Sequence, residues 1–316
     1  MLRDYYYSSL NDYQKRIYDS ILKAALSYDK KATVGGGIFL SNADFEKTID
    51  ALRSDHPELY YLDFNMSVTG GFFSTTLHLK YNIVKSDKIK YDKALDNFMN
   101  FIKAKCQNLK GEYEKALLVH DLFAENLVYD MNEPRAFDLV GPILHKRGVC
   151  QGISFAYKYV LDEIGVDCLT AFGEVHSSTT NGPHAWNLVK VAGRWYHVDV
   201  TLDTKQGDTF FHAYFMNNDS DTFINHRYKY PMNIECRYIN DNYFYRNKAF
   251  FTDIDKAAEY IVNKWNTTNV VEVKILRADK ANNIKNLFNA IGKAGARVNF
   301  FIYPIDQLDV YAVYKK

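Results

Sequence analysis

The apolar positions of the first hundred residues follow two periods. After a capping box that starts at Asn11, apolar residues recur every three or four positions, which predicts a helix over 12–27. A second helix is predicted over 41–53. Apolar and polar residues then alternate over 77–83, the period of a half-buried strand, and a further helix is predicted over 91–105. We therefore expect a small α+β unit at this end of the chain.

The middle of the chain combines a buried helix with a hairpin. A helix is expected over 114–126, and a second begins near Cys150, where apolar residues recur at i, i+3, i+4, i+7, i+8 and i+11 until Gly165 ends it. Two strands then follow, joined by the two-residue loop Ala192-Gly193.

The pattern changes again toward the C-terminus. There it predicts alternating strands and helices, namely a strand over 243–251, a helix over 254–265, a strand over 270–276, a helix over 278–292, and strands over 297–303 and 308–314. We expect an α+β protein of three parts, namely an N-terminal domain over 1–105, a core over 106–235 and a C-terminal module over 236–316.

Composition narrows the function classes. The 39 Lys and Arg residues nearly balance 38 Asp and Glu residues, so no basic surplus marks a nucleic-acid or anionic-membrane binder. Apolar residues make up 47 %, as in an ordinary folded protein. No apolar stretch approaches the ~18 residues of a membrane span, and the first residues lack the apolar h-region of a signal peptide. As read, the chain is expected to be cytoplasmic, or secreted or at the cell surface if a leader has been removed, so its localisation stays open.

Cys150 is a candidate nucleophile because of its place at the start of a helix. The unpaired N–H groups and the positive end of the helix dipole stabilise a thiolate there, and the thiolate is the nucleophilic form of cysteine. The alternative is a small buried apolar residue, which describes most free cysteines. Cys106 and Cys236 are expected to be structural.

His184 and Asp199 are the candidate base and its orienting carboxylate. If Val191 pairs with Arg194 across the hairpin, Trp186 faces Asp199, and His184 is diagonal to Asp199 on the same face of the sheet. A slip of one residue would place the two on opposite faces. The pattern therefore predicts a Cys–His–Asp constellation.

Other residues that could carry chemistry are expected to be structural. His197 shares the face of Asp199 but has no diagonal carboxylate in this register, and His176 falls in a polar loop. Together with Cys168 and His184, these histidines could be imagined as zinc ligands, but the compact spacings of metal sites are missing. We expect no metal and no cofactor.

Three blocks of the middle region resemble the core of the transglutaminase-like superfamily, the bacterial branch of the papain-like cysteine enzymes. They are Gly148-Val149-Cys150-Gln151-Gly152, His184-Ala185-Trp186-Asn187 and Trp195-Tyr196-His197-Val198-Asp199-Val200-Thr201. The resemblance extends over about 110–230, from the helix before Tyr129-Asp130 to the segment between Tyr214 and His226. The N-terminal region is similar, more weakly, to the flanking domain of Gram-positive members.

The resemblance implies a papain-like fold, with a nucleophile helix packed on an antiparallel sheet, and roles for individual residues. Cys150 would be the nucleophile, His184 the base and Asp199 the orienter, in an acyl transfer through a thioester. The backbone N–H of Cys150 would form half of an oxyanion hole. Tyr129 is a candidate for the second donor, and Gln151 and Trp186 are candidates for the oxyanion hole or the cleft.

Two features of the sequence depart from the family pattern and bear on the expected activity. Eukaryotic transglutaminases supply a Trp upstream of the cysteine, whereas all three Trp residues here follow Cys150, and Leu202 stands where many relatives carry Trp. We expect a protease or amidase acting on a peptide or protein. The alternatives are a crosslinking transglutaminase and a non-catalytic scaffold that uses the same groove. The flanking domains are expected to bind a protein or cell-surface partner.

Overall fold

The computed structural model describes residues 4–36, 41–70, 73–177, 180–205, 209–230, 232–276, 282–305 and 308–316. The chain forms two compact units, which are described separately. Unit 1 comprises Met1–Val119 and Leu127–Thr170, and unit 2 comprises His120–Asn126 and Ala171–Lys316. The architecture is α+β with antiparallel sheets, as the sequence pattern predicts. The expected three-part division stays a prediction.

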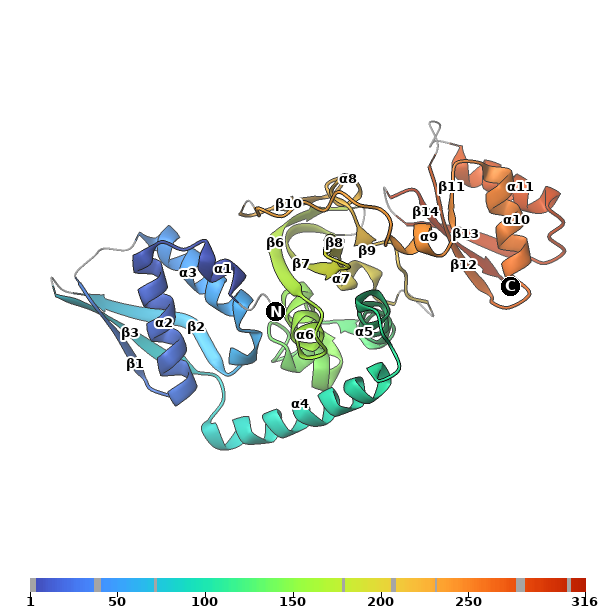
Figure 1. Cartoon of the computed structure of the whole chain (residues 1–316). Helices are drawn as coiled ribbons and strands as arrows, with labels where there is room; N and C mark the ends of the chain where they lie inside the picture. Colours follow the sequence, from blue (N-terminus) through green and yellow to red (C-terminus); the bar gives the residue numbers. More distant parts are fainter. Residues whose placement is uncertain are drawn as a thin grey trace. The chain divides into compact units, whose positions relative to one another are not determined.

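Unit 1 begins with a three-stranded sheet and helices beside it (Figure 1). The antiparallel strands lie in the order β1-β3-β2. The predicted capping box is present, since Asn11 accepts from the backbone of Gln14 while the Gln14 side chain accepts from the Asn11 N–H. The elements are α1 (Tyr5–Ser8), α2 (Asp12–Ser27), β1 (Lys31–Gly35), α3 (Asn42–Asp55), η1 (Pro57–Leu59), β2 (Leu62–Gly70) and β3 (Ser74–Tyr81).

The rest of unit 1 is mainly helical. Its elements are α4 (Lys85–Cys106), the start of α5 (Glu112–Asn126), β4 (Val128–Tyr129), η2 (Gly141–His145), β5 (Arg147–Gly148) and α6 (Cys150–Glu163). Helix α4 starts earlier than the predicted residue 91. The buried Lys158 on α6 donates to Asp162 at 2.6 Å and to the Cys168 carbonyl at 3.0 Å, so its charge is compensated inside the unit.

Unit 2 contains a five-stranded sheet in the order β10-β6-β7-β8-β9. Its elements are β6 (Cys168–His176), β7 (Asn181–Val191), β8 (Arg194–Val198), α7 (Val200–Asp203), β9 (Phe215–Asn217), α8 (Asp219–Thr222) and β10 (His226–Tyr228). The pairs β10–β6, β7–β8 and β8–β9 are antiparallel. No helix among the described parts of the chain is long and apolar enough to cross a bilayer.

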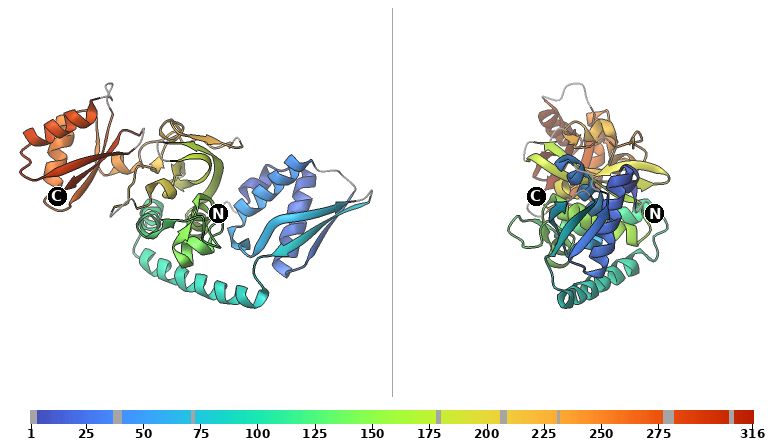
Figure 2. Two further views of the ribbon diagram at one scale, coloured as in Figure 1. Left: turned by 180° about the vertical axis from the view of Figure 1, so that it is seen from behind. Right: turned by 90° about the vertical axis from the view of Figure 1, so that its left-hand side faces the viewer.

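The C-terminal part of unit 2 is a second sheet with two helices on one face (Figures 1 and 2). Its strands lie in the order β11-β12-β14-β13, and apolar residues of α10 and α11 form one buried cluster with β12 and β14. A second cluster joins residues 211–214, beside the first sheet, to residues 308–312. The elements are α9 (Tyr243–Arg246), β11 (Phe250–Phe251), α10 (Ile254–Lys264), β12 (Val270–Ile275), α11 (Asn283–Lys293), β13 (Phe300–Ile305) and β14 (Val310–Lys315).

The predicted strand over 243–251 is wrong. Asn242 caps a short helix there by accepting from the Phe244 N–H, and only Phe250–Phe251 form a strand, β11. The cap and the burial of the Phe244 side chain override the strand propensity of this aromatic run. The first residues of the helix predicted over 278–292 lie outside the described residues, and helix α11 is described from Asn283.

Gly152 sets how closely the first turn of α6 approaches its neighbours. A Cβ at this position would lie 2.1 Å from the Ala136 carbonyl oxygen and 2.9 Å from that of Asp138. Both atoms belong to the backbone, so they cannot move aside as a flexible side chain could. Only glycine allows α6 to start here, and the place of Cys150 depends on it.

We expect Gly152→Ala to destabilise the protein by about 1–3 kcal/mol, because the new methyl group overpacks a backbone contact. The matched control is Gly292→Ala in α11, where a Cβ meets nothing within 4 Å. That change should stabilise by about 0.5–1 kcal/mol through helix propensity. Urea unfolding of both variants measures the difference, and equal midpoints would contradict the close approach.

Candidate functional site

The hairpin of β7 and β8 has the register that the sequence predicts. Val191 pairs with Arg194 and Asn187 with Val198. The loop residues Ala192 and Gly193 both have positive φ, at 48° and 78°, as a two-residue loop of type I′ requires. The hairpin therefore places His184 and Asp199 on one face, as the pairing predicts.

His184 and Asp199 are in direct contact. The imidazole Nε2 donates to Asp199 Oδ2 at 2.7 Å, and both side chains are buried. Asp199 is also the N-cap of α7, where its other carboxylate oxygen accepts from the Leu202 N–H at 3.2 Å. The end of β8 thus positions one Asp199 oxygen to accept from His184 and the other to accept from the first turn of α7.

The environment of Asp199 keeps its carboxyl ionised. Burial alone would raise its pKa, but the charge and hydrogen bond of His184 and the hydrogen bond from His226 hold that pKa well below its usual range. A buried carboxylate of this kind is a fixed negative charge that selects the ring orientation of a histidine and stabilises its protonated form.

His226 is a partner of Asp199 that the sequence analysis missed. Its Nε2 donates to the same Oδ2 at 3.0 Å, and its Nδ1 faces Asn225 Oδ1 at 2.6 Å. It lies on β10, 27 residues after Asp199. Its only signal in the sequence was its place in the trailing segment of the family resemblance.

Trp186 and His197 form a separate buried pair beside this site. Trp186 donates its indole N–H to His197 Nδ1 at 3.0 Å, and His197 donates through Nε2 to Asp219 at 2.9 Å. Burial lowers the pKa of His197, and a ring that accepts from Trp186 and donates to Asp219 is in its neutral form. The N–H of Trp186 is used inside the fold, and the ring packs against Tyr228 with centroids 5.3 Å apart.

Cys150 lies in unit 1, as the first residue of α6. The helix has Val149 as N-cap, and no side chain caps its first N–H groups. Cys150 is partly exposed, whereas Cys106, Cys168 and Cys236 are buried. Burial also raises the pKa of the Cys106 and Cys236 thiols, so these two are poor nucleophiles.

Tyr129 and Gln151 lie on the elements that precede and form the start of α6. Tyr129 is about half exposed, and its strand β4 pairs in parallel with β5, so that Tyr129 is opposite Gly148. Gln151 donates through Nε2 to the Phe137 carbonyl at 2.9 Å. The strand pairing thus brings Tyr129 beside the segment that leads into Cys150.

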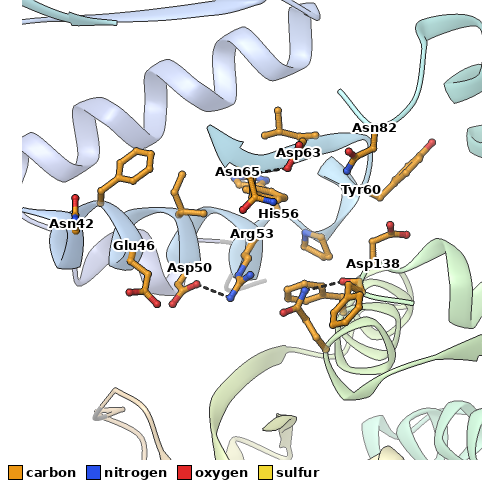
Figure 3. A pocket seen from close by; sticks show the side chains of 18 residues that line it. Asn42, Glu46, Asp50, Arg53, His56, Tyr60, Asp63, Asn65, Asn82 and Asp138 are labelled. Atoms are coloured by element: carbon orange, nitrogen blue, oxygen red, sulfur yellow. Dashed lines mark hydrogen bonds and ion pairs between the residues drawn. The ribbon is translucent and has the colours of Figure 1, made fainter. Parts of the chain in front are cut away.

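A cavity of about 540 Å³ lies within unit 1, next to Gln151 (Figure 3). Glu46, Asp50 and Arg53 line it along one face of α3, and Asp50 pairs with Arg53 at 2.7 Å. His56 also lines it; its Nδ1 contacts Glu58, and its Nε2 is buried without a hydrogen-bond partner. The volume is in the range of small-molecule and side-chain pockets.

Three groups of potential metal ligands occur among the described residues. They are His184, Asp199 and His226; His197, Asp219 and Cys236; and His120, Asp121 and His212. None includes the combination of Cys168, His176, His184 and His197 that was considered from the sequence.

Comparison with known proteins gives a family match in the middle of the chain. The sequence model of the transglutaminase-like superfamily matches residues 99–200. No protein with a curated description matches the chain.

The solved structures that are similar have low sequence identity to this chain. A TGase is 16 % identical, with a TM-score of 0.32, over 54 % of this chain and 50 % of its own. A candidate cysteine protease from Cytophaga hutchinsonii is 15 % identical, with a TM-score of 0.30, over 42 % of this chain and 54 % of its own. A candidate protease from Parabacteroides distasonis is 12 % identical, with a TM-score of 0.27, over 42 % of this chain and 35 % of its own. This chain thus spans about half or less of each.

The family match includes all three residues of the Cys–His–Asp pattern and agrees with the resemblance of the three sequence blocks. Residues 99–200 of this chain are thus similar in sequence to the transglutaminase-like superfamily.

Proposed function

We propose that the protein is a cysteine-nucleophile acyl-transfer enzyme that hydrolyses peptide or protein amides, with Cys150, His184 and Asp199 as its catalytic residues. The observation that carries the proposal is the buried His184–Asp199 hydrogen bond of 2.7 Å. Two further facts support it: a single family match covers all three residues, and Cys150 is the partly exposed cysteine at a helix start.

In the first step of the proposed reaction, His184 activates the thiol. Its Nε2–H is donated to Asp199, so the proposal assigns Nδ1 the proton of the Cys150 thiol. The thiolate attacks the amide carbonyl carbon, a C–S bond forms, and the carbonyl oxygen becomes an oxyanion. The backbone N–H groups at the start of α6 are the proposed main-chain donors for this charge, and Tyr129 is the proposed side-chain donor.

In the second step, the C–N bond breaks. His184 gives its proton to the leaving amine, and the acyl group remains on Cys150 as a thioester. Water then loses a proton to His184, attacks the thioester and releases a carboxylic acid and the thiol. Asp199 stays ionised throughout, since the hydrogen bonds from two histidines favour its charged form.

His226 acts as a positioning residue in this proposal. It donates to the same oxygen of Asp199 as His184 does, which fixes the carboxylate from the side of β10. A carboxylate held at two donors has less freedom to rotate, and the imidazole of His184 is oriented accordingly.

The cavity beside Gln151 is the proposed site for a substrate side chain. Four carboxylates line it, those of Glu46, Asp50, Asp63 and Asp138. Arg53 pairs with Asp50 and Arg135 with Asp138, each at 2.7 Å, so the excess negative charge lies at Glu46 and Asp63. His56 donates Nδ1–H to Glu58, which leaves a buried acceptor at Nε2. An acidic cavity with an unfilled acceptor favours a ligand that donates hydrogen bonds and carries positive charge, such as a lysine or arginine side chain.

Two alternatives share parts of this site. A crosslinking transglutaminase would use a lysine amine in place of water, but the upstream tryptophan that such enzymes supply is missing. A non-catalytic scaffold would need none of the three residues, and the buried polar contact of His184 and Asp199 argues against it.

We expect His184→Ala to lower the rate of iodoacetamide labelling at Cys150 at least about tenfold at neutral pH, because the thiolate loses its cationic partner. Peptide mass spectrometry over a pH series measures this rate. In the unmodified protein, half-maximal labelling should occur below the ~8.5 of a free thiol.

The matched control for the labelling is His176→Ala, since His176 is an exposed histidine at the end of β6. It should label like the unmodified protein. Equal labelling of His184→Ala and the unmodified protein would remove His184 from the mechanism.

We expect water to be the main acyl acceptor. Peptide amides incubated with a primary amine should yield mostly the free acid, and Cys150→Ala should yield neither product. Mass spectrometry of the products distinguishes the acid from the amine adduct. A dominant amine adduct would replace hydrolysis with transglutamination as the activity.

We expect the double variant Glu46→Gln, Asp63→Asn to raise KM about two- to fivefold for substrates with a lysine side chain. A change of this size corresponds to the loss of one partly solvated ion pair. KM for leucine-containing substrates should stay unchanged. Glu259→Gln, an exposed carboxylate on α10 that does not line the cavity, is the control. An equal effect on both substrate types would contradict the assignment of the cavity.

A further inference from the structure

A second cluster of histidines and carboxylates lies in unit 2, apart from the proposed catalytic residues. Its centre is formed by His120 and Asp121 on α5 and by His212 in the segment before β9. We call these three residues the two-histidine cluster. Asp203, at the end of α7, and Glu272, on β12, flank it.

The two rings converge on one carboxylate oxygen. Oδ1 of Asp121 lies 3.0 Å from Nδ1 of His120 and 3.1 Å from Nε2 of His212. Both histidines are buried, whereas the Asp121 side chain is 37 % exposed. The centre of the cluster is thus fixed by buried rings and reached by solvent from the Asp121 side.

The outer nitrogen of each ring faces a further carboxylate, which is buried for Asp203 and partly buried for Glu272. His120 Nε2 lies 3.2 Å from Asp203 Oδ2, and His212 Nδ1 lies 2.7 Å from Glu272 Oε2. Tyr243 stacks on the His212 ring, with centroids 3.8 Å apart. Each ring is therefore held at its outer edge and on a face, with its inner nitrogen directed at Asp121.

This arrangement has a hydrogen-bonding conflict when both histidines are neutral. A neutral imidazole has one N–H, and a ring that donates it to its outer carboxylate, Asp203 or Glu272, has none left for Asp121. The inner nitrogens would then present lone pairs to the lone pairs of Asp121. The conflict is removed by a proton on each ring, by a proton on His212 and on Asp203, or by a cation at the centre. Two imidazolium rings would lie with centroids 5.4 Å apart in a buried site, whereas a cation at the centre satisfies both inner nitrogens and Asp121 together.

We propose that the two-histidine cluster is a binding site for a divalent transition-metal ion, with zinc as the best fit, held by His120 Nδ1, His212 Nε2 and Asp121 Oδ1. Asp203 and Glu272 accept the outer N–H groups, the arrangement that orients metal-bound histidines in proteins. Water completes the coordination from the exposed side of Asp121.

The charges and distances agree with this assignment. Two imidazolium ions and three carboxylates sum to −1, and a divalent cation with two neutral imidazoles and the same carboxylates gives the same sum. The metal thus displaces one proton from each ring. For tetrahedral metal–ligand bonds of ~2.0–2.2 Å, neighbouring ligand atoms are roughly 3.3–3.6 Å apart, so the contacts of 3.0 and 3.1 Å to Asp121 would open by a few tenths of an ångström on metal binding.

The group of His197, Asp219 and Cys236 lacks this conflict. His197 accepts the Trp186 N–H at one nitrogen and donates to Asp219 from the other, so one neutral tautomer satisfies both. It therefore provides an internal comparison for the two-histidine cluster.

A metal ion at the cluster would connect three parts of unit 2. Its ligands lie on α5 and on the segment before β9, while Glu272 belongs to the C-terminal sheet. Asp203 ends the short helix α7 that Asp199 caps. The ion would thus stabilise the end of the short helix whose start is capped by the proposed catalytic carboxylate.

The test is zinc titration of the full chain by isothermal calorimetry after chelator treatment. Cys150→Ser serves as the parent, so that a thiolate at the proposed catalytic residues cannot bind zinc. We expect one equivalent of zinc to bind the parent, with proton release detected by repeating the titration in buffers of different ionisation enthalpy. Asp121→Asn and His212→Gln should weaken binding at least about tenfold.

Two controls keep the result interpretable. His197→Gln should bind zinc like the parent, because that histidine belongs to the comparison group. Asp121→Asn changes a partly exposed, isosteric side chain, so its metal-free melting curve should show a folded protein even if His212→Gln does not fold. A parent that binds no zinc, or an Asp121→Asn variant that binds it as tightly as the parent, would overturn the metal site and leave a pair of protonated histidines.

Discussion

The carboxylate of Asp199 is the constraint on which the sheet of unit 2 depends. It is buried and ionised, and one of its oxygens accepts hydrogen bonds from both His184 and His226. A buried charge is tolerated only when its hydrogen bonds are satisfied, so β7, β10 and the start of α7 must all meet at this residue. The three elements therefore fix the position of the sheet edge and of His184, the proposed catalytic histidine. If β7 or β10 shifted, the Asp199 carboxylate would lose one of its two histidine donors.

The sequence predicted the local parts of this arrangement because their signals are local. The two-residue loop at Ala192-Gly193 fixes the register of the hairpin, and the register places His184 beside Asp199. Helix α6 could be predicted in the same way, from the spacing of its apolar residues. His226 was missed because it reaches Asp199 from a strand 27 residues away, and no spacing rule connects the two. The contact of His212 with Asp121 spans 91 residues, so the spacing rules behind the expectation of no metal could not have shown it.

The N- and C-terminal parts give the chain features that the family match does not cover. The match ends at residue 200, but the acidic cavity is lined mainly by α3 and β2, and Glu272 of the two-histidine cluster comes from β12. In our proposal, the part of the chain that matches the family carries the catalytic residues. Elements outside it line the substrate cavity and supply Glu272 to the two-histidine cluster.

The burial of three of the four cysteines has a consequence for oxidation. A thiolate at Cys150 that meets peroxide forms a sulfenic acid, which is rescued when a second thiol condenses with it. Cys106, Cys168 and Cys236 are buried and therefore poorly placed to supply that thiol. Recovery would then rely on a small external thiol such as glutathione, and in its absence oxidation would proceed to the irreversible sulfinic state. The same burial that directs reactivity to a single sulfur atom makes the other three thiols slow to react with its oxidised form.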